Sequence, residues 1–239
     1  MKFLILQHTD WAGPGRLLEF AMGVHNVRFD LVRVWRDWLP DFSNYDGIIL
    51  LGGSPNVAEE GRYPFLVEEK RFIKRAVAAD KPILAFCLGH QLLAEALGAK
   101  VGPNFAPSIG FVQGYLTHDG REHPAFVNLP KAIPLFKWHS QSVCEPLPKQ
   151  LSLLATSAQC QVEAFSLQDR PHILGVQFDN HAAVPEDMSR WLENDWQWLA
   201  SFRGLALNPA ELFGNAVAIR EELTCNFNTF FGDYLAIIS

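Results

Sequence analysis

The stretch ILAFCLGHQLLAEALG, residues 83–98, decides the fold that the sequence predicts. An apolar run at 83–86 is typical of a buried strand, and a helical pattern follows at 88–97. Cys87 would therefore stand on a tight turn above the carboxyl edge of a sheet, at a helix N-terminus that favours the thiolate. A nucleophile needs both properties, but the spacing alone equally allows an unreactive cysteine at the end of a buried strand.

Short β-rich runs alternate with helical patterns before this stretch. The strand-like runs lie at 2–7, 26–34 and 47–51, and the helical patterns lie near 15–23 and at 64–80. Such alternation is the pattern of βαβ units. We therefore expect an α/β fold with a mostly parallel central sheet that is flanked by helices.

After the cysteine stretch the pattern changes twice. Residues 101–178 are strand-like and interrupted by Pro and Gly, with runs at 111–117, 151–156, 162–167 and 173–178. The chain becomes helical from Pro185, with large apolar residues on one stripe, and a second helical segment at about 209–231 follows Gly204. We expect an α/β domain over residues 1–184 and a C-terminal helical extension over 185–239 that packs on the same domain.

The overall composition limits the classes of partner. The net charge is −6 and no Lys/Arg cluster occurs, which argues against nucleic acid as the main partner. No apolar run approaches the roughly 18 residues that span a bilayer, and MKFLILQ at 1–7 is too short for a signal peptide. We expect a cytoplasmic protein without a membrane partner. The four cysteines have no CxxC spacing, so we expect no metal site, no disulfide framework and no cofactor.

Four blocks of sequence carry a family resemblance. CLGHQLLAEALGAKV at 87–101 resembles the nucleophile segment of class I glutamine amidotransferases, the triad-type glutaminase domains of GMP synthase and of related stand-alone proteins. LGGSPNV at 51–57, WHSQ at 138–141 and ILGVQF at 173–178 follow in the family's order. The resemblance covers nearly the whole chain and implies a flavodoxin-like α/β fold.

The resemblance implies a role for several residues. Cys87 matches the thiol that attacks the γ-carboxamide of glutamine, which gives a glutamyl thioester and free ammonia. The backbone N–H groups of Gly53 and Leu88 match the oxyanion hole. The matching substrate-binding positions are Gly52, Gln91, His139 and Ser140. From the residues alone, the glycine pair would be interpreted as an ordinary turn after a strand.

The chain departs from the family pattern where the last core strand ends. The family phrase is Gln-Phe-His-Pro-Glu, in which the histidine is general base and acid and the glutamate orients it. Here residues 177–181 are QFDNH, so Asp179 replaces the histidine and His181 replaces the glutamate. An ionised Asp179 would disfavour a thiolate on Cys87. On an extended strand the two replacements lie about 6–7 Å apart, so His181 needs a local bend to reach the sulfur.

Three functions remain open at this point. The first is an amidohydrolase that acts on glutamine or a γ-glutamyl compound, uses Asp179 and His181 instead of the usual pair, and supplies ammonia to a separate synthetase subunit. The second is a catalytically inactive relative that serves as a binding or regulatory module. The third is a γ-glutamyl hydrolase or peptidase.

Overall fold

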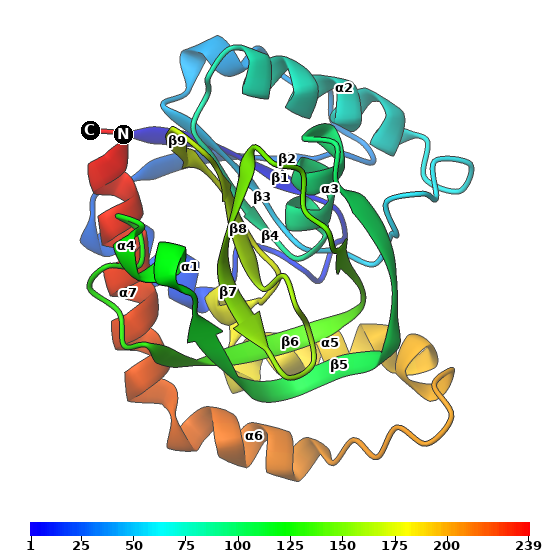
Figure 1. Cartoon of the computed structure of the whole chain (residues 1–239). Coiled ribbons are helices and arrows are strands. Elements are labelled where there is room, and N and C mark those ends of the chain that lie inside the picture. The colour runs from blue at the N-terminus through cyan, green and yellow to red at the C-terminus, as the bar shows by residue number, and fades with distance from the viewer.

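The central element of the structure is one sheet of nine strands (Figure 1). A computed structural model describes every residue of the chain, 1–239. The strands lie side by side in the order β2-β1-β3-β4-β9-β8-β7-β5-β6. In chain order they are β1 (Lys2–Gln7), β2 (Arg28–Arg33), β3 (Gly47–Leu50), β4 (Ile83–Phe86), β5 (Lys100–Leu116), β6 (Ala132–Cys144), β7 (Leu151–Ser157), β8 (Ala164–Leu167) and β9 (Arg170–Val176).

The sheet has a parallel half and an antiparallel half. The pairs from β2 through β1, β3 and β4 to β9 are parallel, which confirms the expected α/β class and the βαβ units. Strands β8, β7, β5 and β6 extend the sheet in antiparallel pairs. β5 begins at Lys100, well before the expected run at 111–117, and β6 carries the WHSQ block. Both depend on pairing with each other, which local apolar periodicity does not reveal.

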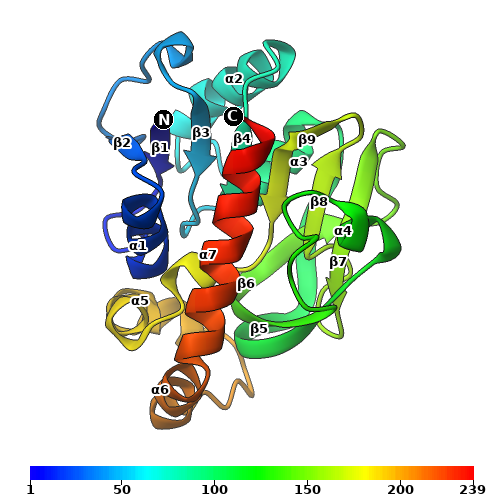
Figure 2. The same ribbon diagram turned by 90° about the vertical axis from the view of Figure 1, so that its left-hand side faces the viewer.

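Helices cover both faces of the sheet (Figure 2). α2 and α3 pack on one face, and α1, α5, α6 and α7 pack on the other. The helices are α1 (Arg16–Val24), α2 (Phe65–Ala78), α3 (Leu88–Ala96), α4 (His118–Glu122), α5 (Pro185–Ala200), α6 (Pro209–Ala218) and α7 (Arg220–Ile237), with short 3₁₀ turns η1 (Phe42–Asn44) and η2 (Asn180–Ala182).

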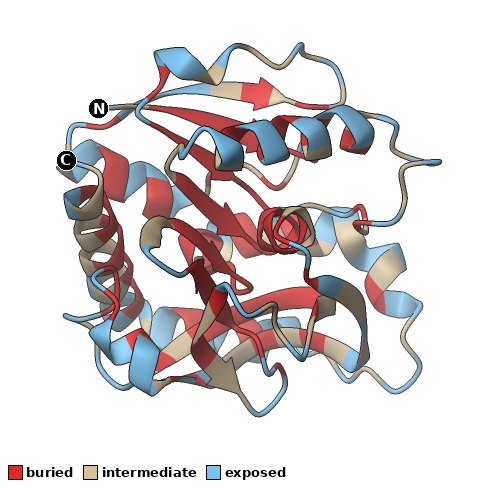
Figure 3. Ribbon diagram, turned by 45° about the horizontal axis from the view of Figure 1, so that its top comes forward, coloured by how far each residue is buried: buried red, intermediate tan, exposed pale blue.

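The two faces of the sheet belong to two apolar cores. On β1, Phe3 and Ile5 join a cluster of 39 buried residues with α1 and α7, whereas Leu4 and Leu6 join a cluster of 26 with α2 and α3. Successive side chains of a strand point to opposite faces, so a strand that is covered on both sides must be apolar throughout. Figure 3 shows the result, with buried strands inside and exposed outer faces on the helices.

The C-terminal region contains two helices after α5, where the sequence pattern indicates one segment at 209–231. α6 and α7 meet at Ile219, whose φ of −108° and ψ of 13° lie outside the helical range. The break lets α7 turn back against α1 and place Phe231 and Tyr234 in the core. The Tyr234 hydroxyl donates to the His172 carbonyl at 2.9 Å, next to β9. None of the helices combines the length and the apolar character that crossing a bilayer requires.

Candidate functional site

Cys87 occupies the sharp turn between β4 and α3. Its φ of 47° and ψ of −107° are unusual for a residue with a side chain. The turn is held by a bond from the Cys87 N–H to the Val176 carbonyl on β9 and by one from the Gly89 N–H to the Leu51 carbonyl, both at 3.0 Å. A Cβ on Gly89 would lie 2.5 Å from the Leu50 carbonyl oxygen, so glycine is needed for this close packing. The strand, turn and helix are those that the sequence predicts.

A cavity of about 180 Å³ opens in front of Cys87. Eight of the nine residues that the family resemblance indicates line it; these are Gly52, Gly53, Cys87, Leu88, Gln91, His139, Ser140 and Asp179. They come from β3, β4, β6, β9 and the segments that follow these strands. The ninth, His181, does not line the cavity and lies behind Asp179.

The glycine pair after β3 forms the wall opposite Cys87. A Cβ on Gly52 would lie 3.2 Å from Asp179 Oδ1 and 3.3 Å from the Cys87 Cβ. A Cβ on Gly53 would lie 2.5 Å from the Cβ of His8. Neither position therefore accommodates a side chain without displacing a neighbour. The backbone itself forms the surface of the cavity here, as an oxyanion hole requires.

His8 and Glu69 form a buried pair behind the glycine wall that sequence reasoning missed. His8 Nε2 lies 2.7 Å from Glu69 Oε1, and His8 Nδ1 lies 3.2 Å from the Gly52 carbonyl oxygen. Neither side chain is exposed to solvent. A histidine directly after the first strand and a glutamate on a helix were the only signals, because the pair spans 61 residues. The pair ties α2 to the Gly52–Gly53 peptide.

Asp179 is a buried carboxyl with no hydrogen-bond partner on either oxygen. Burial raises its pKa from the usual 3.8 to about 8, against smaller lowering effects of Cys87 and Lys137. Burial, and next the nearby Asp179, raise the pKa of the Cys87 thiol well above its usual range. Both groups therefore hold their protons at neutral pH. Asp179 is not the ionised group that the sequence suggests, because its site excludes water.

His181 lies next to Asp179 in the 3₁₀ turn η2. The turn supplies the local bend that an extended strand lacks, and it brings His181 Nδ1 to 4.0 Å from Asp179 Oδ1. That distance is too long for a hydrogen bond, and Nδ1 has no other partner. The imidazole packs on the Phe86 ring at a centroid distance of 4.5 Å, and burial lowers its pKa to about 3. His181 is thus a neutral ring in apolar surroundings.

Asn180 fixes the position of this turn. Its side-chain oxygen accepts from the Phe136 N–H at 2.7 Å, and its amide donates to the Pro134 carbonyl at 2.9 Å. The Asp179 N–H donates to the Phe136 carbonyl at 2.8 Å. The end of β9 is thereby attached to β6. This attachment holds the Asp179 carboxyl against the thiol.

Gln91 and His139 form the floor of the cavity. The Gln91 amide donates to the Gln141 carbonyl at 2.9 Å and to the Gln177 side-chain oxygen at 3.1 Å. His139 Nδ1 lies 2.8 Å from the same Gln141 carbonyl. Burial lowers the pKa of His139 well below its usual range, so this ring is also neutral. Ser140 lines the cavity without a hydrogen bond from its side chain.

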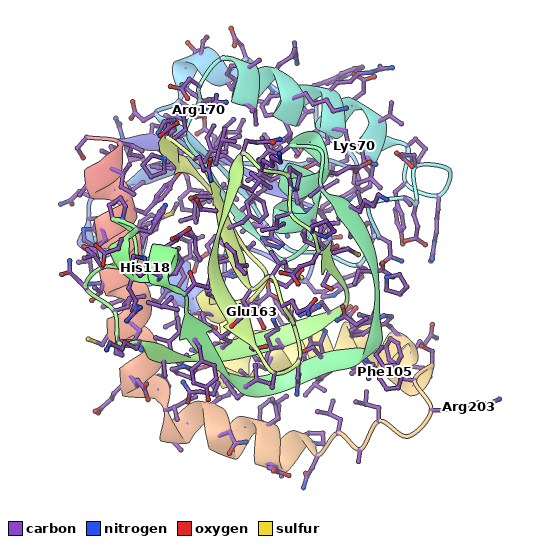
Figure 4. All side chains as sticks on the ribbon, viewed as in Figure 1. Lys70, Phe105, His118, Glu163, Arg170 and Arg203 are labelled. Carbon is purple, nitrogen blue, oxygen red and sulfur yellow. The ribbon has the colours of Figure 1, made fainter.

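A buried ion pair lies beneath the site. Lys137 on β6 contacts Glu163, and neither side chain is exposed. Ser157 donates to the second Glu163 oxygen at 2.6 Å. Glu163 lies among the strands in the interior, whereas Arg203 projects from the loop between α5 and α6 (Figure 4). The Lys137 charge lowers the pKa of both Cys87 and Asp179, but burial outweighs it.

Comparisons with known proteins agree with this geometry. A family model described as glutamine amidotransferase class-I matches residues 15–194. The first of the glutamine-hydrolyzing GMP synthase subunits, from Methanocaldococcus jannaschii, is 35% identical over 148 residues, which are 62% of this chain and 71% of that protein. Gamma-glutamyl peptidase 3 from Arabidopsis thaliana is 29% identical over 166 residues, 66% of each chain.

Solved structures show the same fold. A glutamine amidotransferase from Thermotoga maritima superposes with a TM-score of 0.87 at 24% identity, over 100% of this chain and 98% of that one. One from Methylobacillus flagellatus gives a TM-score of 0.84 at 22% identity, over 100% and 95% of the two chains. The nine-stranded architecture, including the helices after the sheet, is therefore shared by known structures.

Proposed function

The chain belongs to the class I glutamine amidotransferase family, and on that premise we propose that it hydrolyses the γ-amide of glutamine, or of a γ-glutamyl compound, through a thioester on Cys87. The observation that carries the proposal is the position of the thiol, on a strained turn that faces both a cavity and a backbone wall without side chains. A buried structural cysteine needs neither the turn nor the cavity.

The backbone around the thiol suits an oxyanion. The Gly53 N–H donates to no backbone carbonyl, and Leu88 begins α3, where the first N–H groups of a helix have no partner inside it. The helix N-terminus adds a partial positive charge. When the sulfur adds to the carboxamide carbon, the two N–H groups would hold the negative oxygen of the tetrahedral intermediate.

Asp179 would move the proton in place of histidine. Its carboxyl is protonated at neutral pH, and both oxygens are free of partners. One oxygen accepts the thiol proton while the other releases its proton to the leaving nitrogen, so that the carboxyl ends neutral as it began. The C–N bond then breaks and ammonia leaves. Water hydrolyses the thioester by the reverse path, which returns the thiol and gives the γ-carboxylate.

A glutaminase assay tests this chemistry. Cys87→Ala removes the atom that forms the thioester, so ammonia release from glutamine should fall to the background rate. Cys225→Ala, which removes an exposed thiol on α7, is the matched control and should retain the full rate. Equal release by the wild-type protein and Cys87→Ala would remove the hydrolase proposal.

A second function, binding without turnover, is favoured by the same site. The Cys87 thiol and the Asp179 carboxyl are both protonated at neutral pH, which slows the attack. A protein of this kind would bind glutamine and release no ammonia. Calorimetry with glutamine, combined with the glutaminase assay, separates the two functions, and an ammonia rate that depends on Cys87 excludes the second.

We also propose a separate protein chain as the acceptor of the ammonia. Two relatives of this chain are named as one subunit of a glutamine-hydrolyzing GMP synthase, and such a name implies a further subunit. Mixing this protein with a candidate synthetase subunit should raise its glutaminase rate. An unchanged rate and separate elution of the two proteins on gel filtration would argue for an independent hydrolase.

A further inference from the structure

One side of the cavity has an aromatic wall that the proposed hydrolysis does not use. The cavity is lined by four tryptophans, which are Trp11, Trp138, Trp191 and Trp198. The ring centroids of Trp138 and Trp191 lie 5.9 Å apart, and those of Trp138 and Trp198 lie 6.4 Å apart. Trp191 is core-packed, but Trp11 and Trp198 are only half-buried and border the cavity. The wall therefore presents aromatic surface to a ligand.

A single carboxylate lies within this aromatic wall. Asp195 on α5 accepts from the Trp138 indole N–H at 3.0 Å through Oδ2 and from the Ser54 hydroxyl at 3.4 Å through Oδ1. Both donors are neutral. None of the ion pairs in the structure includes Asp195. Burial raises the pKa of Asp195, as expected for a carboxylate that lacks a cationic partner.

The nearest positive side chain of the cavity does not fill this role. Arg62 also lines the cavity, but its side chain is mostly exposed, and it pairs with Glu59 at 3.8 Å and lies over the Tyr63 ring. Lys137 is engaged with Glu163 inside the sheet. The negative charge of Asp195 is consequently left for a ligand.

We propose that Asp195 and the surrounding indole rings form a subsite for a primary ammonium group of the substrate. A carboxylate attracts a cation and accepts its hydrogen bonds, and the faces of tryptophan rings attract the same charge through their π electrons. Ser54, which contacts Asp195, follows Gly53 directly, so the subsite lies beside the oxyanion wall. The helical extension would thus supply the charge that selects the substrate.

This subsite rests on the proposed function and refines its substrate. An ammonium group can come from two sources in a γ-glutamyl compound. One is the α-ammonium of the glutamyl part, which three carbon atoms separate from the γ-carbonyl carbon. The other is a second amine carried by the leaving group, as in a γ-glutamyl diamine. Both present the same chemistry to Asp195.

Two ligand pairs distinguish these sources in a binding experiment on Cys87→Ala protein, which cannot form the thioester. Calorimetry compares L-glutamine with Nα-acetyl-L-glutamine, and γ-L-glutamyl-1,4-diaminobutane with γ-L-glutamyl-butylamine. We expect the cationic member of at least one pair to bind tenfold or more tightly. Asp195→Asn, which keeps an oxygen for the Trp138 indole, should reduce that ratio to nearly one. Glu193→Gln, on the exposed side of α5, is the control and should leave the ratio unchanged.

The ratio separates recognition of charge from damage to the fold, because damage weakens both members of a pair equally. Loss of discrimination in the glutamine pair assigns the subsite to the α-ammonium, and loss in the diamine pair assigns it to the leaving group. Discrimination that is the same in Asp195→Asn would overturn the subsite and leave the proposed hydrolysis intact.

A simple cation covers the case in which no γ-glutamyl ligand binds. n-Butylammonium should quench the tryptophan fluorescence of the Asp195 protein more than n-butanol does, and Asp195→Asn should lose this difference. That result without glutamine binding would refute the proposed substrate and support the subsite. Absence of any difference between the two proteins would refute the subsite.

Discussion

Two buried pairs of a histidine and a carboxyl lie on opposite sides of the Gly52–Cys87 centre, and they differ in almost every physical respect. His8 and Glu69 are 2.7 Å apart, and the second His8 nitrogen lies 3.2 Å from the Gly52 carbonyl. Asp179 and His181 are 4.0 Å apart, and neither Asp179 oxygen nor His181 Nδ1 has a hydrogen-bond partner.

The difference shows how one site combines support and reactivity. A buried pair with complementary contacts is stable in a single arrangement and holds the backbone that it touches. Buried polar groups without partners carry a free-energy cost, and they persist where function uses them. The His8 pair therefore fixes the glycine wall, and the Asp179 pair leaves its protons available to a substrate.

The largest expected effect comes from exchanging the residues of the second pair. Asp179→His combined with His181→Glu places a base beside Cys87 and a carboxylate behind it. A positioned base contributes about 10²–10⁴ in rate, so the glutaminase kcat at pH 7.5 should rise by that order. The same exchange in Cys87→Ala protein should give no activity. A folded double variant with an unchanged rate would show that Asp179 does not limit turnover.

Matched leucine substitutions should separate the two histidines by stability. His8→Leu leaves Glu69 buried without its partner, which should cost about 3–5 kcal/mol of unfolding free energy. His181→Leu removes a ring nitrogen that has no partner, so the change should stay within about 1 kcal/mol. Urea unfolding of both variants measures the difference. Equal losses would mean that the two pairs support the fold to the same extent.

The pH dependence of stability gives the smallest expected effect. Between pH 4 and pH 8 the native protein keeps a proton on Asp179, with a pKa of about 8, that the unfolded chain has lost at its usual 3.8. This group therefore makes the protein less stable as the pH rises through that window. Asp179→Asn does not titrate, so its advantage over wild type should grow from pH 5 to pH 8, to on the order of 2 kcal/mol.

Thermal unfolding of both proteins at several pH values measures this trend. The low pKa values of His90 and His181, about 3 for each, produce an opposite slope below pH 6.5. That slope is present in both proteins, so their difference isolates Asp179. A constant difference between pH 5 and pH 8 would mean that the Asp179 carboxyl is already ionised in the native protein.

Local sequence was sufficient for the parallel half of the sheet and for the cysteine turn. The runs at 2–7 and 83–86 match β1 and β4, because a strand buried on both faces must be apolar at every position. The break at Ile219 and the length of β5 were not predictable in this way. Both follow from packing against elements that are distant in the chain.

The sequence by itself determined which chemical groups are present and in what order, including a thiol after a strand, a glycine pair, and Asp179 where the family has histidine. Only the tertiary structure decided their state, because pKa and hydrogen bonding depend on burial and on neighbours from distant segments. It placed Glu69 on His8 across 61 residues and brought Asp195 of α5 to the aromatic wall. It also removed water from Asp179, which turned an expected anion into a carboxylic acid.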